Sequence, residues 1–248
     1  MDRSTPLLAN RPVGMDRGAK PFHRWGRPPL VVGTIHSPGS LQRALQMGEG
    51  AVDFLELRVD HFADQPEVLL RAVARLRTPM IVTVRHPNEG GARPLSWQQR
   101  KDLFARFLPV GALIDVELRS MEKLAETIVA ARATKARIIV SDHHFRFTPS
   151  RAHLAETIRR AKSAGADVVK VAACVARVSD LARLVALFIR PSSIPLSVMG
   201  MGTLGKVSRL LFACAGSVLN YGYLDRPQVA GQWEATLLKK RIAEMFAE

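Results

Sequence analysis

A single lysine interrupts an otherwise apolar run of the chain. Lys170 lies between Val169 and Val171 in the segment DVVKVA, a pattern typical of a strand that is buried on both faces. A buried ammonium group is costly to desolvate, and a neutral amine is a nucleophile toward ketones, which is the requirement for Schiff-base catalysis. The alternative is structural: the lysine forms an ion pair with carboxylates that point inward from other strands.

Two histidines end the apolar run that precedes this lysine along the chain. His143 and His144 close the segment VSDHHF, and in a strand their side chains point to opposite faces. The ends of neighbouring parallel strands lie within side-chain reach, and a histidine exchanges protons near neutral pH. We therefore expect His143 to act as a general acid and base beside Lys170.

Charged residues also share faces in three other apolar runs. The period of two brings them together within FLELRVDHF and within ALIDVEL, and IVTVRHPNEGG adds an arginine and a loop carboxylate. These residues are Glu56, Arg58, Asp60, Arg85, Glu89, Asp115 and Glu117. The inward carboxylates could hold Mg²⁺ through oxygen ligands, but the neighbouring cations favour a buried charge network. No cluster of ligand residues has the sequence spacing of a zinc site, so we predict no metal.

The elements that must position these residues alternate regularly along the chain. Short apolar runs predict strands that start near residues 30, 53, 80, 112, 137, 167, 194 and 217. Helical spacing is clearest at 66–77, 96–108, 120–133, 150–165 and 178–189, with a last helix at about 232–246. Ser120 and Ser179 are interpreted as helix start signals, and Gly165 as a helix end.

Eight strand–helix units in about 220 residues leave no room for a second domain. Such alternation implies parallel strands with right-handed crossovers, and this length favours a closed (β/α)8 TIM barrel, like that of the class I aldolases. An open, doubly wound sheet is the competing fold, but no GxGxxG follows the first predicted strand. We predict one barrel over residues 29–248, preceded by a flexible basic tail, rich in Pro and Arg, at residues 1–28.

A glycine-rich segment, SVMGMGTLGKVSR, follows the seventh predicted strand and leads to Arg209. On a barrel this loop often binds phosphate at a helix N-terminus, although the glycines can equally be turn residues. Arg209 either binds a carboxylate with both nitrogens or lies on a solvated helix face. Gln232 follows a glycine at the start of the closing helix.

The chain is strongly basic, with 36 Lys and Arg against 22 Asp and Glu and a formal charge of +14. Such a charge fits a nucleic-acid partner, a small anionic substrate or simply a proteome that is basic in general. No dense basic block with interleaved aromatic residues is present, which favours the small substrate. We expect no membrane partner and a cytoplasmic location, because the sequence has no apolar run of about 18 residues, no secretory signal and only two cysteines.

Taken together, these segments resemble type I 3-dehydroquinate dehydratase, over about residues 29–247. Each motif is moderately specific, and their order along the strands is highly specific. The motifs are ELRVDHF (56–62), TVRHPNEGG (83–91), IDVEL (114–118), SDHHFRFTP (141–149), VVKVA (168–172), MGTLGKVSR (201–209) and GQ (231–232).

The resemblance implies a hydro-lyase that removes water from 3-dehydroquinate to give 3-dehydroshikimate, the third step of chorismate and aromatic amino acid biosynthesis. It implies no metal or organic cofactor. It implies that Lys170 forms an imine with the C3 ketone, that His143 moves protons at C2 and at the C1 hydroxyl, and that Glu89 orients His143. The substrate-binding positions that it implies are Glu56, Arg58 and Arg85 for ring hydroxyls, and Arg209 and Gln232 for the carboxylate.

The sequence departs from the family pattern at a few positions. These are His144, where an acidic residue is usual, Gln228 in place of serine, Ala230 in place of proline, and Gly33, where some members have serine. They leave both catalytic positions intact and bear mainly on the shape of the last loop.

Two other functions fit parts of the sequence. One is a Schiff-base aldolase for a phosphorylated sugar, with the glycine-rich loop as its phosphate site. The other is a basic barrel that has lost catalysis and binds nucleic acid. Barrels of this family often dimerise, so a homodimer is also expected, although the sequence contains no unambiguous apolar patch.

Overall fold

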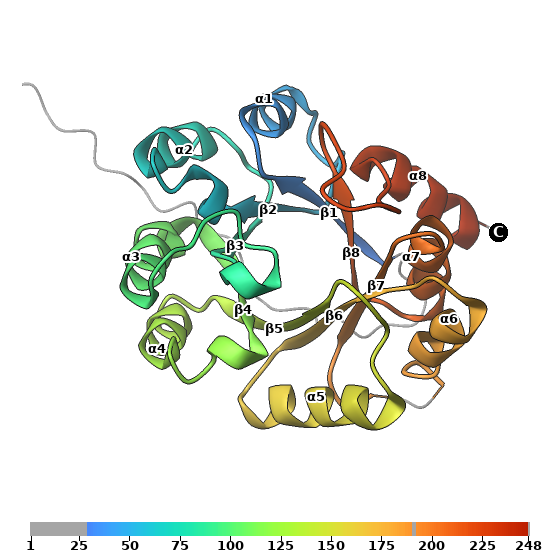
Figure 1. Ribbon diagram of the computed structural model, residues 1–248. Coiled ribbons are helices and arrows are strands. Elements are labelled where there is room, and N and C mark those ends of the chain that lie inside the picture. The colour runs from blue at the N-terminus through green and yellow to red at the C-terminus, as the bar shows by residue number, and fades with distance from the viewer. Residues whose placement is uncertain (1–28, 190–191, 248) are drawn as a thin grey trace, which may run out of the picture.

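The computed structural model describes residues 29–189 and 192–247, and the predicted tail at 1–28 lies outside the described residues. Within these described residues, eight parallel strands form a barrel and eight helices surround it (Figure 1). The predicted (β/α)8 TIM barrel is thereby confirmed. None of the helices in the described part of the chain is long and apolar enough to cross a membrane.

Each predicted strand is present, in the order expected from the sequence. The strands are β1 (Leu30–Ile35), β2 (Phe54–Arg58), β3 (Met80–Thr83), β4 (Gly111–Glu117), β5 (Arg137–His144), β6 (Val168–Cys174), β7 (Leu196–Met201) and β8 (Leu219–Tyr223). Each strand begins within two residues of its predicted start.

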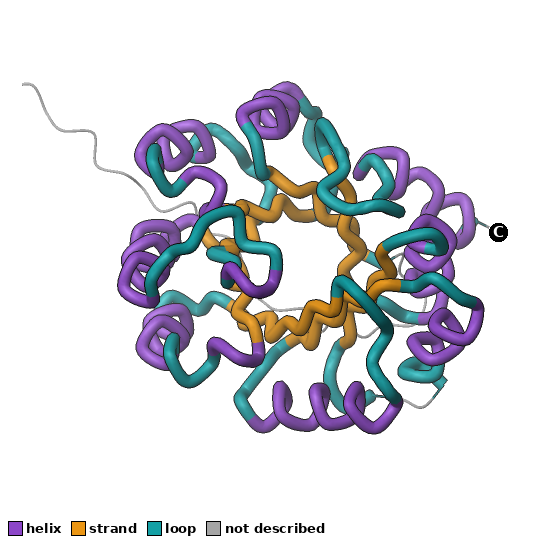
Figure 2. The backbone as a smooth tube through the Cα atoms, in the orientation of Figure 1, coloured by secondary structure: helices purple, strands orange, loops and turns teal. Residues whose placement is uncertain are grey.

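The helices lie on the outside of the strand ring, as the tube in Figure 2 shows. They are α1 (Pro38–Gln46), α2 (Pro66–Val73), α3 (Trp97–Phe107), α4 (Ala125–Ala133), α5 (Arg151–Ser163), α6 (Val178–Val185), α7 (Gly205–Ala215) and α8 (Ala235–Phe246). Short 3₁₀ turns follow β2, β3, α3 and β4.

The structure confirms the predicted helix end but not the two predicted helix starts. Gly165 follows α5 in the left-handed conformation, at φ +82°, as predicted for a residue just past a helix end. The start predicted at Ser120 is wrong: α4 begins at Ala125, because the Ser120 hydroxyl donates to Glu117 instead of capping a helix. The start predicted from Ser179 is also displaced, since Arg177 is the N-cap of α6 and the Asp180 carboxylate accepts from its N–H.

Hydrogen bonds join every neighbouring strand pair from β7 through β1 to β8. The remaining seam, between β7 and β8, is bridged near its start by the Val218 N–H, which donates to the Leu196 carbonyl at 2.9 Å. Two serine hydroxyls extend the seam: Ser197 donates to the Leu219 carbonyl at 2.7 Å, and Ser217 accepts from the Val198 N–H at 3.0 Å. Side chains thus complete the barrel where backbone pairing is sparse.

Apolar side chains fill two regions of the fold. One lies between the strands and the helices, and the other includes buried residues of seven strands within the barrel. The second contains Val32, Ile81, Leu113, Ile139, Val168 and Leu219, all at most 2% exposed. This apolar floor excludes water from beneath the charged residues, which come later along the same strands.

Candidate active site

Lys170 lies inside the barrel in a layer of four side chains from alternate strands. Its Nζ atom is 2.9 Å from Asp115 Oδ2 on β4, 3.4 Å from Glu56 Oε1 on β2 and 3.9 Å from the centre of the Tyr221 ring on β8. Layers of this kind are characteristic of (β/α)8 barrels. Burial by itself raises the pKa of Asp115, but Arg85 and Lys170 outweigh burial and hold that pKa well below its ordinary value.

The ion pair named as the structural alternative for Lys170 is therefore present. With the lysine side chain 4% exposed, its charge is balanced by neighbouring carboxylates rather than by water. A catalytic role requires the amine to give up a proton before it attacks a ketone.

A buried network of arginines and carboxylates surrounds this layer. Arg85 contacts Asp115 through both terminal nitrogens, at 3.0 and 2.9 Å, and Glu117 at 3.1 Å. Arg100, which is 0% exposed, donates to the other Glu117 oxygen at 2.7 Å, and Ser141 donates to Asp115 at 2.6 Å. The carboxylate oxygens proposed as an Mg²⁺ cage thus already have protein partners.

His143 lies on β5, the neighbour of β6, closer than Lys170 to the C-terminal ends of the strands. The β5–β6 register pairs Ser141 with Lys170 and His143 with Ala172, so His143 shares the inward face one pair closer to the strand ends. Its Nδ1 atom lies 2.9 Å from Glu89 Oε2, which fixes the orientation of the ring.

The histidine and its carboxylate have opposite pKa shifts. Burial, followed by the charges of Arg85 and Lys170, lowers the pKa of His143 well below its ordinary value. Burial raises the pKa of Glu89 to about 8, against the opposing charge of Arg85. Both groups are therefore uncharged near neutral pH, and the imidazole has one proton and one lone pair, as an acid–base catalyst requires.

Arg58 holds the loop that carries Glu89. Its Nε and Nη2 atoms donate to the two oxygens of Asp60 at 3.0 and 2.9 Å, and Nη2 also donates to the Gly90 carbonyl at 2.8 Å. Asp60 accepts from the Ala92 N–H at 2.9 Å as well. The end of β2 thus fixes the β3–α3 loop and, with it, the carboxylate beside His143.

Arg209 is a buried cation near the start of α7. It donates to the carbonyls of Tyr221, at 2.6 Å, and Gly231, at 3.2 Å, and its residue is 2% exposed. Within residues 29–189 and 192–247 no carboxylate forms an ion pair with it, and burial lowers its pKa to about 10. Such a guanidinium suits an anion that enters from outside.

Gln232 shapes the loop between β8 and α8. Its Oε1 atom accepts from the N–H of Gln228 at 2.6 Å and of Val229 at 3.4 Å, which leaves the amide nitrogen as a donor. The same loop lines a cavity of 350 Å³, to which Gln232 contributes but Lys170 and His143 do not. Gln228, where the family pattern has serine, thus contacts Gln232 through its backbone N–H.

The glycines of the β7–α7 loop meet the β8–α8 loop directly. The Gly202 N–H donates to the Ala230 carbonyl at 2.9 Å, and a Cβ at Gly205 would lie 2.7 Å from the Gly231 Cα. Gly231 itself has φ +82°. These glycines permit close backbone contact, and the N–H groups of Gly202 and Gly205 donate to carbonyls rather than facing a phosphate.

The absence of a side chain at Gly33 also has a packing reason. A Cβ at this position would lie 2.7 Å from Leu224 Cδ2. Leu224, which directly follows β8, occupies the space that a serine would need.

Sequence reasoning missed two features of this region. Tyr221 stands in the layer of Lys170, and the period of two along β8 is the only sequence signal that could have placed it there. Asp142, His144 and His153 form a second cluster outside the barrel, although their spacing matches no zinc motif. The distance between β5 and α5 along the chain conceals their proximity in the fold.

The fold and these contacts define a class of protein: a (β/α)8 barrel with a buried, carboxylate-held lysine beside a histidine–glutamate pair. The sequence matches the family model described as type I 3-dehydroquinase over residues 32–247. A 3-dehydroquinate dehydratase of Methanocella arvoryzae is 34% identical over 206 residues, which cover 83% of this chain and 91% of that protein. Another, of Methanothermobacter thermautotrophicus, is 33% identical over 210 residues, covering 84% and 91% respectively.

Solved structures agree with these relatives. The 3-dehydroquinate dehydratase of Geobacillus kaustophilus superposes with a TM-score of 0.78 at 26% identity, over 88% of this chain and 91% of that one. The chain belongs to the type I 3-dehydroquinase family.

Proposed function

We propose that this enzyme dehydrates 3-dehydroquinate to 3-dehydroshikimate through an imine at Lys170. The observation that carries the proposal is the burial of Lys170 between Asp115 and Glu56, on the same inward face as His143. Activity on 3-dehydroquinate rests on the family and on the relatives of that name. The imine and the roles of individual residues rest on the geometry.

In the proposed reaction Lys170 loses a proton, attacks the C3 ketone and forms a carbinolamine, which loses water to give a protonated imine. The imine nitrogen withdraws electrons, so His143 can remove a proton from C2 and leave an enamine. His143 then gives a proton to the C1 hydroxyl, which departs as water while the electrons return to the imine. Addition of water to the imine releases the product and the amine, for a net loss of one water.

Glu89 acts as a positioning residue in this scheme. Its 2.9 Å contact with Nδ1 directs the other ring nitrogen of His143 toward the barrel interior. The lowered pKa of His143, caused first by burial, keeps the imidazole neutral and able to accept a proton at pH 7.

The substrate carboxylate binds Arg209 in this proposal. That guanidinium is buried with backbone carbonyls as its described partners, so an incoming carboxylate supplies the negative charge that the site lacks. Gln232 adds an amide donor, and Glu56 and Arg58 bind ring hydroxyls. Arg85, which also holds Asp115 in place, binds a ring hydroxyl as well in this proposal.

The competing functions receive less support. A phosphosugar aldolase requires free N–H groups in the β7–α7 loop, and those of Gly202 and Gly205 already donate to carbonyls. A barrel that merely binds nucleic acid does not require a histidine–glutamate pair beside a buried lysine.

Borohydride trapping tests the proposal. The purified protein is incubated with 3-dehydroquinate and borohydride, which reduces an imine to a stable amine, and the adduct is located by intact mass and peptide mapping. We expect an adduct on Lys170, with 3-dehydroshikimate formed in the unreduced sample. Lys170→Met abolishes both, whereas Lys101→Met, at a half-buried lysine on α3 paired with Glu126, changes neither. Turnover by folded Lys170→Met would refute the imine.

We also propose that the enzyme is a cytoplasmic homodimer that takes a small anionic substrate, without nucleic-acid or membrane partners, and that it works in aromatic amino acid biosynthesis. Light scattering during size-exclusion chromatography measures the dimer, and a monomer mass would exclude it. Growth of a 3-dehydroquinate dehydratase-deficient host without aromatic supplements tests the biosynthetic role.

A further inference from the structure

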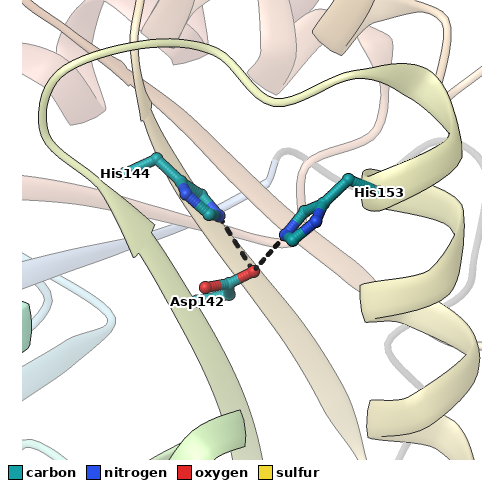
Figure 3. A group of neighbouring side chains, drawn as sticks. All are labelled: Asp142, His144 and His153. Carbon is teal, nitrogen blue, oxygen red and sulfur yellow. Dashed lines mark hydrogen bonds and ion pairs between the residues drawn. The ribbon is translucent and has the colours of Figure 1, made fainter.

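A second cluster of ionisable side chains lies at the end of β5, on the face opposite the proposed catalytic site. Asp142 and His144 flank His143 in the strand, so their side chains point away from the barrel interior while His143 points into it. His153 reaches the same place from the first turn of α5 (Figure 3). The three ligand atoms lie within 4.8 Å of one another.

Both imidazoles converge on one carboxylate oxygen. His144 Nε2 lies 2.9 Å from Asp142 Oδ2, and His153 Nε2 lies 3.8 Å from the same atom. The first contact is a hydrogen bond, but the second is too long to be one. Figure 3 shows the two rings approaching that oxygen from different sides, and their planes are nearly perpendicular, at 84°. A hydrogen bond thus explains the position of His144 beside Asp142 but not that of His153.

The spacing fits the coordination shell of a transition-metal ion. Zinc binds imidazole nitrogen and carboxylate oxygen at about 2.1 Å, which puts tetrahedral ligand atoms about 3.4 Å apart. The observed contacts of 2.9 and 3.8 Å lie on either side of that value. Movements of about half an ångström would bring each nitrogen to the required distance from the oxygen.

The surroundings provide orientation and access. The Thr157 hydroxyl donates to Asp142 Oδ2 at 3.0 Å, which is the outer support typical of a metal-binding carboxylate. The Ser150 hydroxyl accepts from the His153 N–H at 3.2 Å and fixes the backbone of that ligand. The His153 side chain is 55% exposed, whereas that of Asp142 is 17% exposed, so an ion can enter from solvent and keep water as a further ligand.

We propose that Asp142, His144 and His153 bind one divalent transition-metal ion of the Zn²⁺ type. Two nitrogens and one oxygen suit zinc and its neighbours in the first transition row, while Ca²⁺ and Mg²⁺ prefer sites built from oxygen alone. The ion links the end of β5 to α5 across residues 145–150, and it thereby stabilises the segment that begins at His143.

This site is separate from the proposed dehydration. Asp142 and His144 lie on the outer face of β5 and His153 lies on α5, and no step assigned to Lys170 or His143 passes through the site. The departure from the family pattern at position 144 supplies one of the two imidazoles.

A zinc titration of the full chain tests the site. The protein is dialysed against a chelator, transferred to metal-free buffer at pH 7.5 and titrated with Zn²⁺ by calorimetry. We expect one equivalent to bind and the melting temperature to rise with Zn²⁺ concentration. Co²⁺ in place of Zn²⁺ should give visible absorption bands whose intensity reports four or five ligands.

Single histidine variants locate the ligands. His153→Gln and His144→Gln should each lower the Zn²⁺ affinity at least tenfold and remove the rise in melting temperature. His86→Gln is the matched control, because His86 is a partly buried histidine that accepts from the Asn88 N–H in another segment, and it should leave the affinity unchanged.

If His144→Gln folds poorly, the variant of the more exposed ligand, His153→Gln, tests the site by itself. His153 lies largely in solvent, so His153→Gln should fold like the wild type by circular dichroism. Absence of Zn²⁺ binding by the wild-type chain overturns the proposal, and so does unchanged binding by folded His153→Gln, since the ion would then be held elsewhere. Dehydratase activity should persist in metal-free protein, so this test stands apart from that of the proposed function.

Discussion

Replacing Glu89 by glutamine should remove the contribution of this one residue to the pH dependence of the free energy of unfolding. Burial raises the pKa of Glu89 from 4.5 to about 8, so the folded protein retains a proton there that the unfolded chain loses above pH 4.5. The contribution of this residue to stability is therefore complete below pH 4.5 and declines as the pH rises to about 8. Glutamine resembles the protonated carboxyl group in shape and cannot ionise.

The size of the effect follows from the shift. Each unit of pKa difference corresponds to about 1.4 kcal/mol, so the stability of Glu89→Gln relative to wild type should increase by about 4 kcal/mol between pH 5 and pH 8. At pH 5 the two proteins should be nearly equal. His143 has a lowered pKa, and its contribution is lost as the pH falls below its ordinary value of 6.5 in both proteins, so it largely cancels in the difference.

Urea denaturation at intervals from pH 5 to pH 9 measures this difference, provided that the slopes against urea agree. Glu126→Gln is the control. A hydrogen bond from Lys101 lowers the pKa of this exposed carboxylate, so its contribution is lost only in acid below that range, and its difference from wild type should stay constant from pH 5 to pH 9. A difference between Glu89→Gln and wild type that stays constant across the pH range would refute the assignment of a buried, protonated Glu89.

Three further changes test other parts of the structure. His143→Ala should reduce turnover by about 10²–10⁴-fold while borohydride still traps substrate, and full activity would contradict its acid–base role. Arg100→Met leaves Glu117 buried without one of its cations and should lower the free energy of unfolding by about 3–5 kcal/mol in urea titrations. Gly231→Ala, at φ +82° and with its Cβ 2.6 Å from a neighbouring carbonyl oxygen, should raise KM in steady-state assays, and an unchanged KM would show that the loop tolerates the contact.

The barrel could be predicted from the sequence because each unit has its own signal. A buried parallel strand is a short apolar run, and a helix on the outside of a barrel repeats its apolar residues every three or four positions. The predicted helix starts failed where a polar side chain hydrogen-bonds to a group outside the helix that it was expected to cap. Ser120 has the form of a helix cap, yet its hydroxyl donates to Glu117, and the helix starts five residues later.

The candidate site was predictable where it breaks a pattern. Lys170 and His143 were found because a charge or an imidazole in an apolar strand is unusual. Tyr221 was not predicted because an aromatic residue in a strand is ordinary. The second cluster was not predicted because His153 is one histidine among other polar residues of a surface helix. Only the fold brings its Nε2 atom within 3.8 Å of Asp142 Oδ2. Sequence patterns identify the strand, whereas proximity across elements requires coordinates.

The layer of Lys170 has a consequence for how the barrel responds during turnover. The ammonium group in the ion pair with Asp115 and Glu56 and the protonated imine of the proposed reaction both place one positive charge at the same nitrogen. The two carboxylates, fixed by strands β4 and β2, therefore experience nearly the same field before and after the covalent bond forms. Little reorganisation of the protein is needed, because its dipoles and charges are already arranged for the intermediate. A rigid barrel interior, closed to water from below, is well suited to a reaction in which the substrate changes while the local charge stays constant.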